Sequence, residues 1–349
     1  MTTGRPRRSR LDLQEGRVEL CHGAGGRATR QLIAEVFQAA LDNEWLRQGN
    51  DHALLPPMQG PLVMTTDAYV VSPLFFPGGD IGRLAVHGTV NDLAMGGAQP
   101  LWLSASFIIE EGFALADLQR IADSMGRAAR EAAVAVVAGD TKVVERGKGD
   151  GVFVSMTGVG CVLPGVHVSG DRARPGDVVL VSGTLGDHGV AVMSGRENLG
   201  FDTHIVSDSA ALHGLVAAMA ARHGPALHCL RDPTRGGLAA TLNELACQSG
   251  VGIVLDEAAL PVRREVAAAC ELLGLDPLNV ANEGKLVAIV AEEAGPGVLA
   301  SMRSHPLGRE AALIGTVVTD AQQLVRMSTG FGGERVVDWL WGEQLPRIC

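Results

Sequence analysis

Aromatic residues and positive charge are both scarce in this sequence. Phe, Trp and Tyr make up 4% of the 349 residues, which argues against base stacking as a way of binding nucleic acids. Lys and Arg number 29 against 39 Asp and Glu, and the formal charge of −10 argues against nucleic acids and anionic membranes as partners. No stretch approaches the roughly 20 apolar residues that a membrane span needs. We therefore expect no nucleic-acid partner and no membrane partner.

Several familiar motifs are also absent. The six cysteines include no C-x-x-C pair, and a disulfide framework is not expected in a chain of this length. Their scatter among apolar residues indicates a reducing environment, so we expect a cytoplasmic protein. Gly147-Lys148 is followed by glycine rather than Ser or Thr, which excludes a Walker A loop, and no G-x-G-x-x-G follows an apolar strand. The absence of G-x-S-x-G removes support for an esterase.

The apolar segments that are present indicate two α/β units. Strands alternate with helical patterns on both sides of residues 164–177, where Pro, Gly and charged residues cluster. The predicted division is a disordered basic extension (1–17), a first domain (18–165), a second domain (175–330) and a C-terminal tail (331–349).

Four local predictions concern the surroundings of the candidate site. A helix is expected over residues 28–41, and Asp80 is expected to cap a helix that ends at Met95. A strand over 134–138 should deliver a loop at 139–142. A further helix is expected over 208–222.

Four carboxylates lie at the ends of apolar runs or in glycine-bounded loops: Asp67, Asp92, Asp140 and Asp232. A carboxylate at the carboxyl end of a strand is presented at the sheet edge, where α/β folds bind ligands. Converging carboxylates repel one another unless a cation lies among them, and oxygen ligands suit Mg²⁺. Each Asp alone is equally well explained as a cap or turn residue, but the set favours a metal site.

Glycine-rich segments offer backbone N–H groups to phosphates at His22–Arg27, Gly183–Gly189 and Gly236-Gly237. Lys142 follows an apolar strand and either neutralises phosphate or is an ordinary solvated lysine. Glu283 precedes a strand and is either a general base or a loop carboxylate. These features together indicate an enzyme that uses Mg²⁺ and phosphate without a P-loop.

The chain ends on Pro346-Arg347-Ile348-Cys349. This segment is either a frayed terminus or an arm that carries a reactive thiol into a site. A prenylation signal is excluded because it needs Cys four positions from the end. In the second interpretation Pro346 stiffens the arm, Ile348 docks in an apolar channel, and Arg347 meets an acidic or phosphate-lined mouth.

These motifs resemble the HypE family of hydrogenase maturation factors, within the AIR synthase-like (PurM-like) superfamily of ATP-dependent proteins. The matching segments cover nearly all of the chain from about residue 18. They are His22–Arg27, Thr65–Asp67, Phe75–Ala94, Gly139–Glu145, Ser182–Gly189, Arg231–Gly237, Asn282–Lys285 and the terminal tetrapeptide. The tetrapeptide is the most specific, because other members of the superfamily lack it.

The resemblance implies an α/β (α+β) fold of two domains. The N-terminal domain has a mixed sheet that forms a dimer interface with ATP nearby, and the C-terminal domain is an α/β sandwich followed by a flexible tail. It also implies a reaction, in which the carbamoyltransferase HypF loads a carbamoyl group onto Cys349 and ATP then drives dehydration of this S-carboxamide to S-thiocyanate. A HypC–HypD scaffold complex would receive the cyanide as an iron ligand of [NiFe] hydrogenase.

The resemblance further implies roles for individual residues. Cys349 carries the substrate, Lys142 contacts the transferring phosphoryl group, and Glu283 is the candidate base. Asp67, Asp92 and Asp140 are expected to bind Mg²⁺. The expected ATP contacts are His22, Gly23, Gly25, Gly26, Arg27, Asn91, Thr141, Asp232, Arg235 and Gly236, with Asp232 also a possible metal ligand.

Two other hypotheses remain open from the sequence. One is a small-molecule phosphotransferase similar to selenophosphate synthetase, which would need a reactive cysteine such as Cys21 beside the first glycine loop. The other is a carrier without enzymatic activity that only displays Cys349 to partners. The carboxylates argue against the carrier, because a carrier has no need of them.

Overall fold

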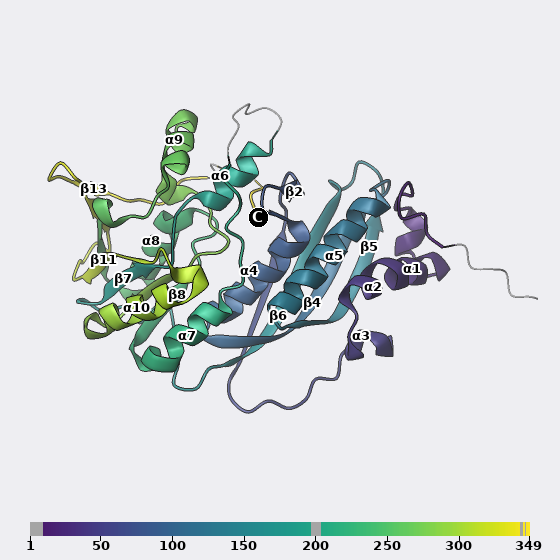
Figure 1. Cartoon of the computed structure of the whole chain (residues 1–349), viewed down its shortest axis with the longest axis horizontal. Coiled ribbons are helices and arrows are strands. Elements are labelled where there is room, and N and C mark those ends of the chain that lie inside the picture. Colours follow the sequence, from purple (N-terminus) through teal and green to yellow (C-terminus); the bar gives the residue numbers. More distant parts are fainter. Residues whose placement is uncertain (1–9, 197–203, 343–344, 346) are drawn as a thin grey trace, which may run out of the picture.

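The computed structural model describes residues 10–196, 204–342, 345 and 347–349, and it consists of two α/β domains that meet along one helix (Figure 1). Each domain is built on its own sheet, and the two sheets share no strand. Within the described residues, no helix is both long enough and apolar enough to cross a membrane.

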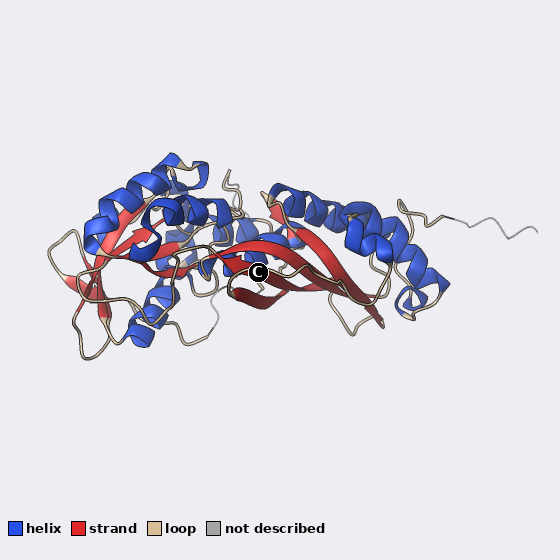
Figure 2. Cartoon of the chain, turned by 90° about the horizontal axis from the view of Figure 1, so that it is seen from below, coloured by secondary structure: helices blue, strands red, loops and turns tan. Residues whose placement is uncertain are grey.

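The first domain is built on a four-stranded mixed sheet in the order β1-β6-β4-β5, in which only β4 and β5 are parallel. Its strands are β1 (Leu62–Tyr69), β4 (Ala98–Glu110), β5 (Ala135–Val144) and β6 (Val152–Val162). Helices α4 (Ile81–Met95) and α5 (Leu115–Glu131) cover one face (Figure 2). The other face is open in the described chain, and Leu62 and Met64 on it are 61% and 70% exposed.

Helix α4 lies at the junction of the domains. The predicted cap is confirmed, because the Asp80 carboxylate accepts the backbone N–H groups of Gly82 and Arg83 at 2.8 and 3.1 Å. Thirteen of the fifteen helix residues are buried, since α4 contacts the first sheet, α5 and elements of the second domain. Gly88 permits close packing on β1, because a Cβ there would lie 2.5 Å from the Tyr69 hydroxyl.

The second domain is an α/β sandwich around a seven-stranded sheet in the order β13-β12-β9-β11-β7-β10-β8. Its strands are β7 (Val178–Val181), β8 (Leu227–Arg231), β9 (Gly252–Asp256), β10 (Val287–Val290), β11 (Ala312–Val318), β12 (Val325–Ser328) and β13 (Glu334–Val336). On one face lie α7 (His213–His223) and α10 (Gly295–Ser304), and on the other α8 (Gly237–Ser249). Alternate residues of β7 enter different cores, which explains its uninterrupted apolar sequence.

The remaining elements are short. They are α1 (Arg27–Leu32), a π-helical turn (Ile33–Phe37), α2 (Gln38–Leu41), α3 (Glu44–Gln48), β2 (Phe75–Phe76), β3 (Gly79–Asp80), α6 (Asp187–Ser194), α9 (Arg264–Leu273) and single 3₁₀ turns at Leu20–Gly23, Gly224–Ala226, Glu257–Ala259, Pro277–Asn279, Glu292–Ala294 and Pro306–Gly308. The helix expected over 28–41 is therefore present, with a π turn inside it.

Some sequence predictions need correction. Residues 10–17 are not a disordered extension: Leu11 and Leu13 pack on the core of the first domain, and Arg17 forms a β-bridge with Ala114. The helix predicted over 208–222 begins only at His213. The first part of the predicted tail forms β13, since its backbone continues the sheet.

A further correction concerns two loops. β5 continues through residues 139–142, so the expected loop there is strand, paired in parallel with β4. The predicted loop Gly183–Gly189 ends at Gly186, because α6 begins at Asp187. Apolar periodicity did not reveal either change, because both segments consist largely of small and polar residues.

Candidate functional site

Three carboxylates form one electrostatic group at the junction of the domains: Asp67 on β1, Asp92 on α4 and Asp232 after β8. Burial, and then the neighbouring Asp92, raise the pKa of Asp232 to about 7. Burial also raises the pKa of Asp92, against the lowering effect of its 2.7 Å hydrogen bond from the Thr65 hydroxyl. These side chains therefore lie close enough to oppose one another's ionisation.

Glu283 belongs to the same group. Its side chain is 3% exposed, its Oε1 atom has no hydrogen-bond partner, and burial followed by the charge of Asp232 raises its pKa well above the ordinary value. Its backbone N–H donates to Asp208 Oδ1 at 2.9 Å, and its carbonyl accepts from Asn91 Nδ2 at 3.2 Å. Only the ionised form of this side chain could accept a proton, and burial makes that form a stronger base than a solvent-exposed carboxylate.

Asn91 supports this arrangement. Its Nδ2 group also donates to the Ala210 carbonyl at 3.0 Å, and its Oδ1 atom accepts the Leu212 N–H at 2.8 Å. The side chain is 1% exposed. The structure therefore uses Asn91 to join α4 to the Glu283 loop, whereas the sequence predicted an ATP contact.

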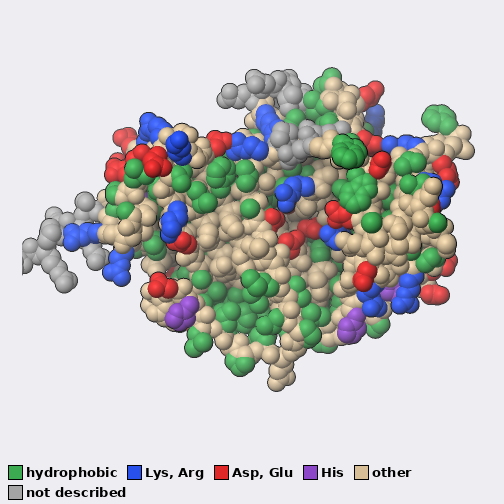
Figure 3. Space-filling model, turned by 180° about the vertical axis from the view of Figure 1, so that it is seen from behind, with side chains coloured by type: hydrophobic (Ala, Val, Ile, Leu, Met, Phe, Trp, Pro, Cys, Tyr) green, Lys and Arg blue, Asp and Glu red, His purple; other side chains and the backbone are tan. Residues whose placement is uncertain are grey.

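Arg235 supplies positive charge beside the carboxylates. Its guanidinium lies 3.8 Å from Asp67 Oδ1, and its side chain is 68% exposed. Gly236 and Gly237 follow with positive φ angles of 75° and 61° and begin α8. Seen from behind, acidic and basic side chains gather between the two halves of the molecule (Figure 3). This is the surface at which a charged ligand would meet the carboxylate group.

The C-terminal tail enters the same region. The terminal carbonyl oxygen of Cys349 accepts the Val70 N–H at 3.1 Å, and the Arg347 carbonyl accepts the Ser72 N–H at 3.0 Å. Ile348 is 3% exposed within an apolar cluster that includes Val190. Since Val70 directly follows β1, Cys349 is held about 10 Å along the strand from Asp67.

Arg347 has an acidic partner as well. Its guanidinium forms an ion pair and hydrogen bond with Asp150, and its carbonyl accepts from Arg196 at 3.2 Å. The expectations that Ile348 meets apolar residues and Arg347 an acidic group thus match the inserted tail. The predicted stiffening by Pro346 falls on a residue outside those described.

The remaining predicted residues form a second group on β5. Lys142 Nζ bonds both carboxylate oxygens of Asp140 at 2.9 and 3.0 Å, and this hydrogen bond lowers the pKa of Asp140. Both side chains are more than 60% exposed on the open face of the sheet. Thr141 points the other way and is buried. Asp140 and Lys142 therefore present an ion pair on the outside of the described chain.

The two groups cannot meet within one chain. Asp67 is registered with Met156, Met156 with Ala105, and Ala105 with Gly139, so three strand spacings separate β1 from β5. At about 4.8 Å each, they amount to about 14 Å. Asp140 therefore cannot share one Mg²⁺ with Asp67 and Asp92 of the same chain, because Mg²⁺ ligands lie about 2 Å from the ion. That all three residues bind Mg²⁺ stays a prediction.

The first glycine-rich loop lies beside the β5 group. Gly23 packs against Val143, where a Cβ would lie 2.5 Å from the backbone nitrogen. His22 is buried, and its Nδ1 atom accepts the Glu19 N–H at 2.9 Å, so this ring anchors the loop. A Cβ at Gly25 or Gly26 would meet nothing within 4 Å. The backbone there is open to a ligand, as is expected of a loop that covers phosphates.

Mg²⁺ fits the carboxylate group only together with a ligand. Among the described residues, no three His, Cys, Asp or Glu side chains are placed to hold a metal ion by themselves. Mg²⁺ commonly binds through one or two carboxylates plus phosphate oxygens and water. Asp67 and Asp92 satisfy this pattern, since a cation would offset the burial and, after it, the mutual repulsion that raise the pKa of Asp92 and Asp232.

The sequence did not single out several residues that hold the tail and the base. They are Val70, Asp150, His188, Arg196 and Asp208. Backbone groups and long-range pairs such as Val70 with Cys349 leave no local sequence signal. His188 lies in the Ser182–Gly189 motif but was interpreted only as one of several structural or substrate-positioning histidines, and Asp208 lies in none of the matching motifs.

Two family models match the chain. The N-terminal domain of AIR synthase related proteins matches residues 49–162, and the C-terminal domain matches residues 174–327. The chain is 66% identical over 340 residues to a carbamoyl dehydratase HypE of Rhizobium leguminosarum bv. viciae, and the match covers 97% of each chain.

Solved structures agree with these matches. A crystal structure of the hydrogenase maturation protein HypE in complex with ATP is similar with a TM-score of 0.91 and 50% identity, over 95% of this chain and 99% of that one. A HypE–HypF complex contains a chain similar with a TM-score of 0.78 and 52% identity, over 88% of this chain and 99% of that one. The two-domain AIR synthase-like fold is thus confirmed, and the chain belongs to the HypE family of hydrogenase maturation proteins.

Proposed function

We propose that this protein uses ATP to dehydrate an S-carboxamide on its own Cys349 to an S-thiocyanate, as the source of the cyanide ligands of the [NiFe] hydrogenase iron. The observation that carries the proposal is the insertion of the terminal cysteine at the end of β1, which also bears Asp67. The strand that carries Asp67 therefore also leads to the segment that holds the terminal Cys349. A frayed terminus would not have its last three residues bonded and packed in this way.

The first step activates a poor leaving group. The amide oxygen of the loaded Cys349 attacks the γ-phosphorus of ATP, and the bond from that phosphorus to ADP breaks. The amide carbon now carries phosphate, which leaves readily. Arg235 lies beside Asp67 in a position to bind a phosphate oxygen, and the backbone at Gly25 and Gly26 is sterically open to phosphates.

The second step forms the carbon–nitrogen triple bond. One N–H proton goes to Glu283 and the other to the departing phosphate, the C–O bond breaks, and the original amide oxygen leaves within that phosphate. The products are the S-thiocyanate, ADP and phosphate, so atoms balance with the net loss of one water. Glu283 is suited to take a proton, because its Oε1 atom has no partner and burial raises its pKa.

Mg²⁺, when bound with ATP, would neutralise charge on the phosphates. Asp67 and Asp92 are the residues that would hold it, and Thr65 orients Asp92 through its hydroxyl. If the nearby positive charge restores the ionisation of Asp232, its side chain would bind the cation as a carboxylate. If it stays protonated, it would be a proton donor.

Lys142 and Asp140 enter this proposal through a homodimer. They lie at the far edge of the sheet from Asp67, on the face left open in the described chain. Exposed Leu62 and Met64 on that face are suited to pack against a second copy. In such a dimer the Lys142 ammonium, with the His22–Arg27 loop, would serve the carboxylate group of the other subunit, while Thr141 stays buried behind the sheet.

The partners follow from the same proposal. A carbamoyltransferase of the HypF type would load Cys349, in keeping with the HypE–HypF complex among the similar structures. A HypC–HypD complex would accept the cyanide. These exchanges take place in the cytoplasm in our proposal, and they require the tail to leave its inserted position.

Intact-mass measurement tests the reaction. The carbamoyl-loaded chain is incubated with ATP and Mg²⁺, and we expect one water to be lost from a peptide that contains Cys349. Cys349→Ala should take up no carbamoyl group, yet it should bind ATP with unchanged affinity, because the thiol is not among the proposed ATP contacts. Cys247→Ala, which removes an exposed thiol elsewhere, is the control and should react normally.

A water loss in the Cys349→Ala protein would contradict the proposal. So would a loaded wild-type chain that hydrolyses ATP while its carboxamide persists. The phosphotransferase alternative has less support, because burial and the neighbouring Glu19 raise the pKa of the Cys21 thiol and disfavour its thiolate.

A further inference from the structure

The inserted tail is held at three successive carbonyl groups, and each has a different partner. The Arg347 and Cys349 carbonyls accept backbone N–H groups of Ser72 and Val70. Between them, the Ile348 carbonyl accepts from His188 Nε2 at 2.9 Å. This bond comes from a side chain of α6 in the second domain, as does the 3.2 Å bond from Arg196 to the Arg347 carbonyl from the residues just after α6. The two backbone bonds come from the chain that follows β1 in the first domain.

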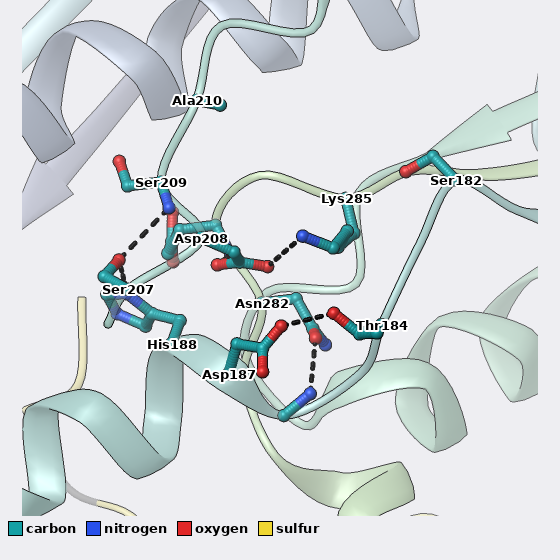
Figure 4. A network of polar contacts seen from close by, with 12 residues as sticks. Ser182, Thr184, Asp187, His188, Ser207, Asp208, Ser209, Ala210, Asn282 and Lys285 are labelled. Atoms are coloured by element: carbon teal, nitrogen blue, oxygen red, sulfur yellow. Dashed lines mark hydrogen bonds and ion pairs between the residues drawn. The ribbon is translucent and has the colours of Figure 1, made fainter. Parts of the chain in front are cut away.

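The surroundings of His188 fix which ring nitrogen carries the proton. A carbonyl can only accept, so Nε2 must be the donor to Ile348. Nδ1 then accepts from the Ser207 hydroxyl at 2.8 Å, and the Ser207 oxygen in turn accepts the Ser209 N–H at 3.1 Å. Figure 4 shows the Ser207 side chain directed at the imidazole ring and toward Ser209.

Packing fixes the orientation of the same ring. Phe76 of β2 meets the imidazole edge to face, with ring centres 5.5 Å apart and an interplanar angle of 87°. The His188 side chain is fully buried, and burial lowers its pKa. These contacts hold the ring in the orientation that presents Nε2 to the Ile348 carbonyl.

The segment that fixes His188 also holds the proposed base. Between Ser207 and Ser209 lies Asp208, whose Oδ1 atom accepts the backbone N–H of Glu283 at 2.9 Å. Its other oxygen lies 3.2 Å from Lys285 Nζ, as Figure 4 shows. Three consecutive residues therefore connect the tail-binding imidazole to the loop that carries Glu283.

We propose that His188 is a positioning residue: its Nε2–H group holds the Ile348 carbonyl and so keeps Cys349 inserted at the end of β1. The inference rests on the proposed function, in which the tail alternates between an inserted and a released position. A histidine with a merely structural role would bond to a fixed part of the fold. The His188 Nε2–H group is instead a buried donor whose acceptor lies on the tail, a segment that leaves its inserted position in the proposed function.

Protection of the Cys349 thiol tests this proposal without any turnover. The full chain is treated with iodoacetamide, and alkylation of each cysteine is followed by peptide mass spectrometry. In His188→Leu we expect Cys349 to react roughly three to ten times faster, the change in inserted population that one hydrogen bond accounts for. The exposed thiols of Cys21 and Cys247 should react at unchanged rates.

Two further variants separate positioning from general loss of stability. His188→Gln retains an N–H donor at about the reach of Nε2 and should restore most of the protection. His228→Leu removes a comparably buried histidine that bonds Asp177 at 2.7 Å, away from the tail, and should leave Cys349 protected. If His188→Leu does not fold, Ser207→Ala weakens the same tautomer and should give a smaller increase in the same direction.

The rates of carbamoyl loading and of water loss should change in opposite directions in His188→Leu. Loading of Cys349 by the carbamoyltransferase needs the released tail, so His188→Leu should be loaded at least as fast as wild type. Water loss from the loaded chain with ATP needs the inserted tail, so it should slow by a similar factor with the KM for ATP unchanged. Equal Cys349 alkylation in wild type and His188→Leu would overturn the proposal, whereas a wild-type chain that loses no water would overturn only the proposed function.

Discussion

At the scale of the residue, Asp232 links the stability of the fold to pH. The side chain is 9% exposed, and burial followed by the charge of Asp92 raises its pKa from 3.8 to about 7. A raised pKa means that the folded protein favours the neutral carboxyl. The corresponding stability is fully present below the unfolded pKa near 4 and is lost as pH rises from about 4 to about 7.

Replacing Asp232 should therefore stabilise the ligand-free protein at high pH. We expect Asp232→Asn to increase the free energy of unfolding at pH 8 by up to about 4 kcal/mol, at about 1.4 kcal/mol for each pKa unit, because Asn cannot ionise. The gain should shrink toward zero as the pH falls to 4. Urea unfolding at pH 4, 6 and 8 measures this, with Asp51→Asn as an exposed control. A gain that is independent of pH would contradict the assignment.

The residue types of the site were accessible from the sequence, and several of their partners were not. Asp67, Asp92, Asp232 and Glu283 stand out because carboxylates beside apolar strands need a reason to be there. Asp208 did not stand out, since its segment is helical in appearance and its role depends on one hydrogen bond to the backbone of Glu283. Such a bond is a property of the folded chain.

At the scale of the element, the close approach of α4 and α5 depends on glycine. A Cβ at Gly82 would lie 2.3 Å from the carbonyl oxygen of Ile121 on α5. Gly126 makes a similar approach to the Ala40 carbonyl, so α5 is held tightly on both sides. Backbone atoms cannot move aside as a flexible side chain can, and the helices would have to separate.

Gly82→Ala should destabilise the protein for this reason. The expected loss is about 1–3 kcal/mol in the free energy of unfolding, typical of overpacking, despite the higher helix propensity of alanine. Gly214→Ala in α7 is the matched control, because its nearest neighbour is the end of the His305 ring at 3.3 Å. Urea unfolding compares the two. Equal stability of Gly82→Ala and wild type would show that α4 can shift without loss.

The elements differ in how far the sequence predicted them. Asp80 and the apolar spacing that follows it predicted α4, since capping and helical periodicity are local. The length of β5 was underestimated, because Gly139 and Asp140 are poor strand formers that the pairing with β4 overrides. The start of α7 at His213 was missed, because the segment from Ser207 to Leu212 is occupied with tertiary hydrogen bonds instead.

At the scale of the whole molecule, the residues of the proposed site are divided between opposite edges of one sheet. The carboxylate group lies at β1 and the Lys142–Asp140 pair at β5, about 14 Å apart by strand spacing. A homodimer that packs through the open face would bring the β1 edge of each subunit to the β5 edge of its partner. The proposed reaction then needs two chains for every complete site.

Mixing two inactive variants tests this arrangement. Lys142→Ala and Glu283→Gln should each abolish water loss from the loaded tail. After subunit exchange, about half of the dimers should be mixed, and each should hold one intact site, which restores about a quarter of wild-type activity. Light scattering confirms the dimer, and Met64→Asp on the open face should produce monomers without activity.

The control for this experiment is a chain that carries both substitutions. When this chain is mixed with wild type and Lys142 acts across the interface, no mixed dimer has a complete site, since each site then lacks one of the two residues. Each mixed dimer has one complete site if both residues act within a chain. Failure of the two single variants to complement, despite exchange of subunits, would place Lys142 and Glu283 in the same chain's site.

The sequence by itself determined the features that depend on neighbours along the chain. The cap at Asp80, the apolar strands of both sheets, the glycine-rich loops and the terminal Arg347-Ile348-Cys349 are all local, and a family resemblance could be recognised from them. The residue types at Asp67, Asp92 and Glu283 already indicated the chemistry. The residue types did not indicate how far apart these side chains lie in the folded protein.

Only the tertiary structure decided which of these residues meet. Strand order placed Asp140 and Lys142 away from Asp67, because pairing between strands is non-local and leaves no trace in either strand alone. Insertion of Cys349 depends on the backbone of Val70 and on the tautomer of His188, and the pKa of Asp232 depends on burial. Each of these is a relation between segments far apart in sequence, which exists only once the chain has folded.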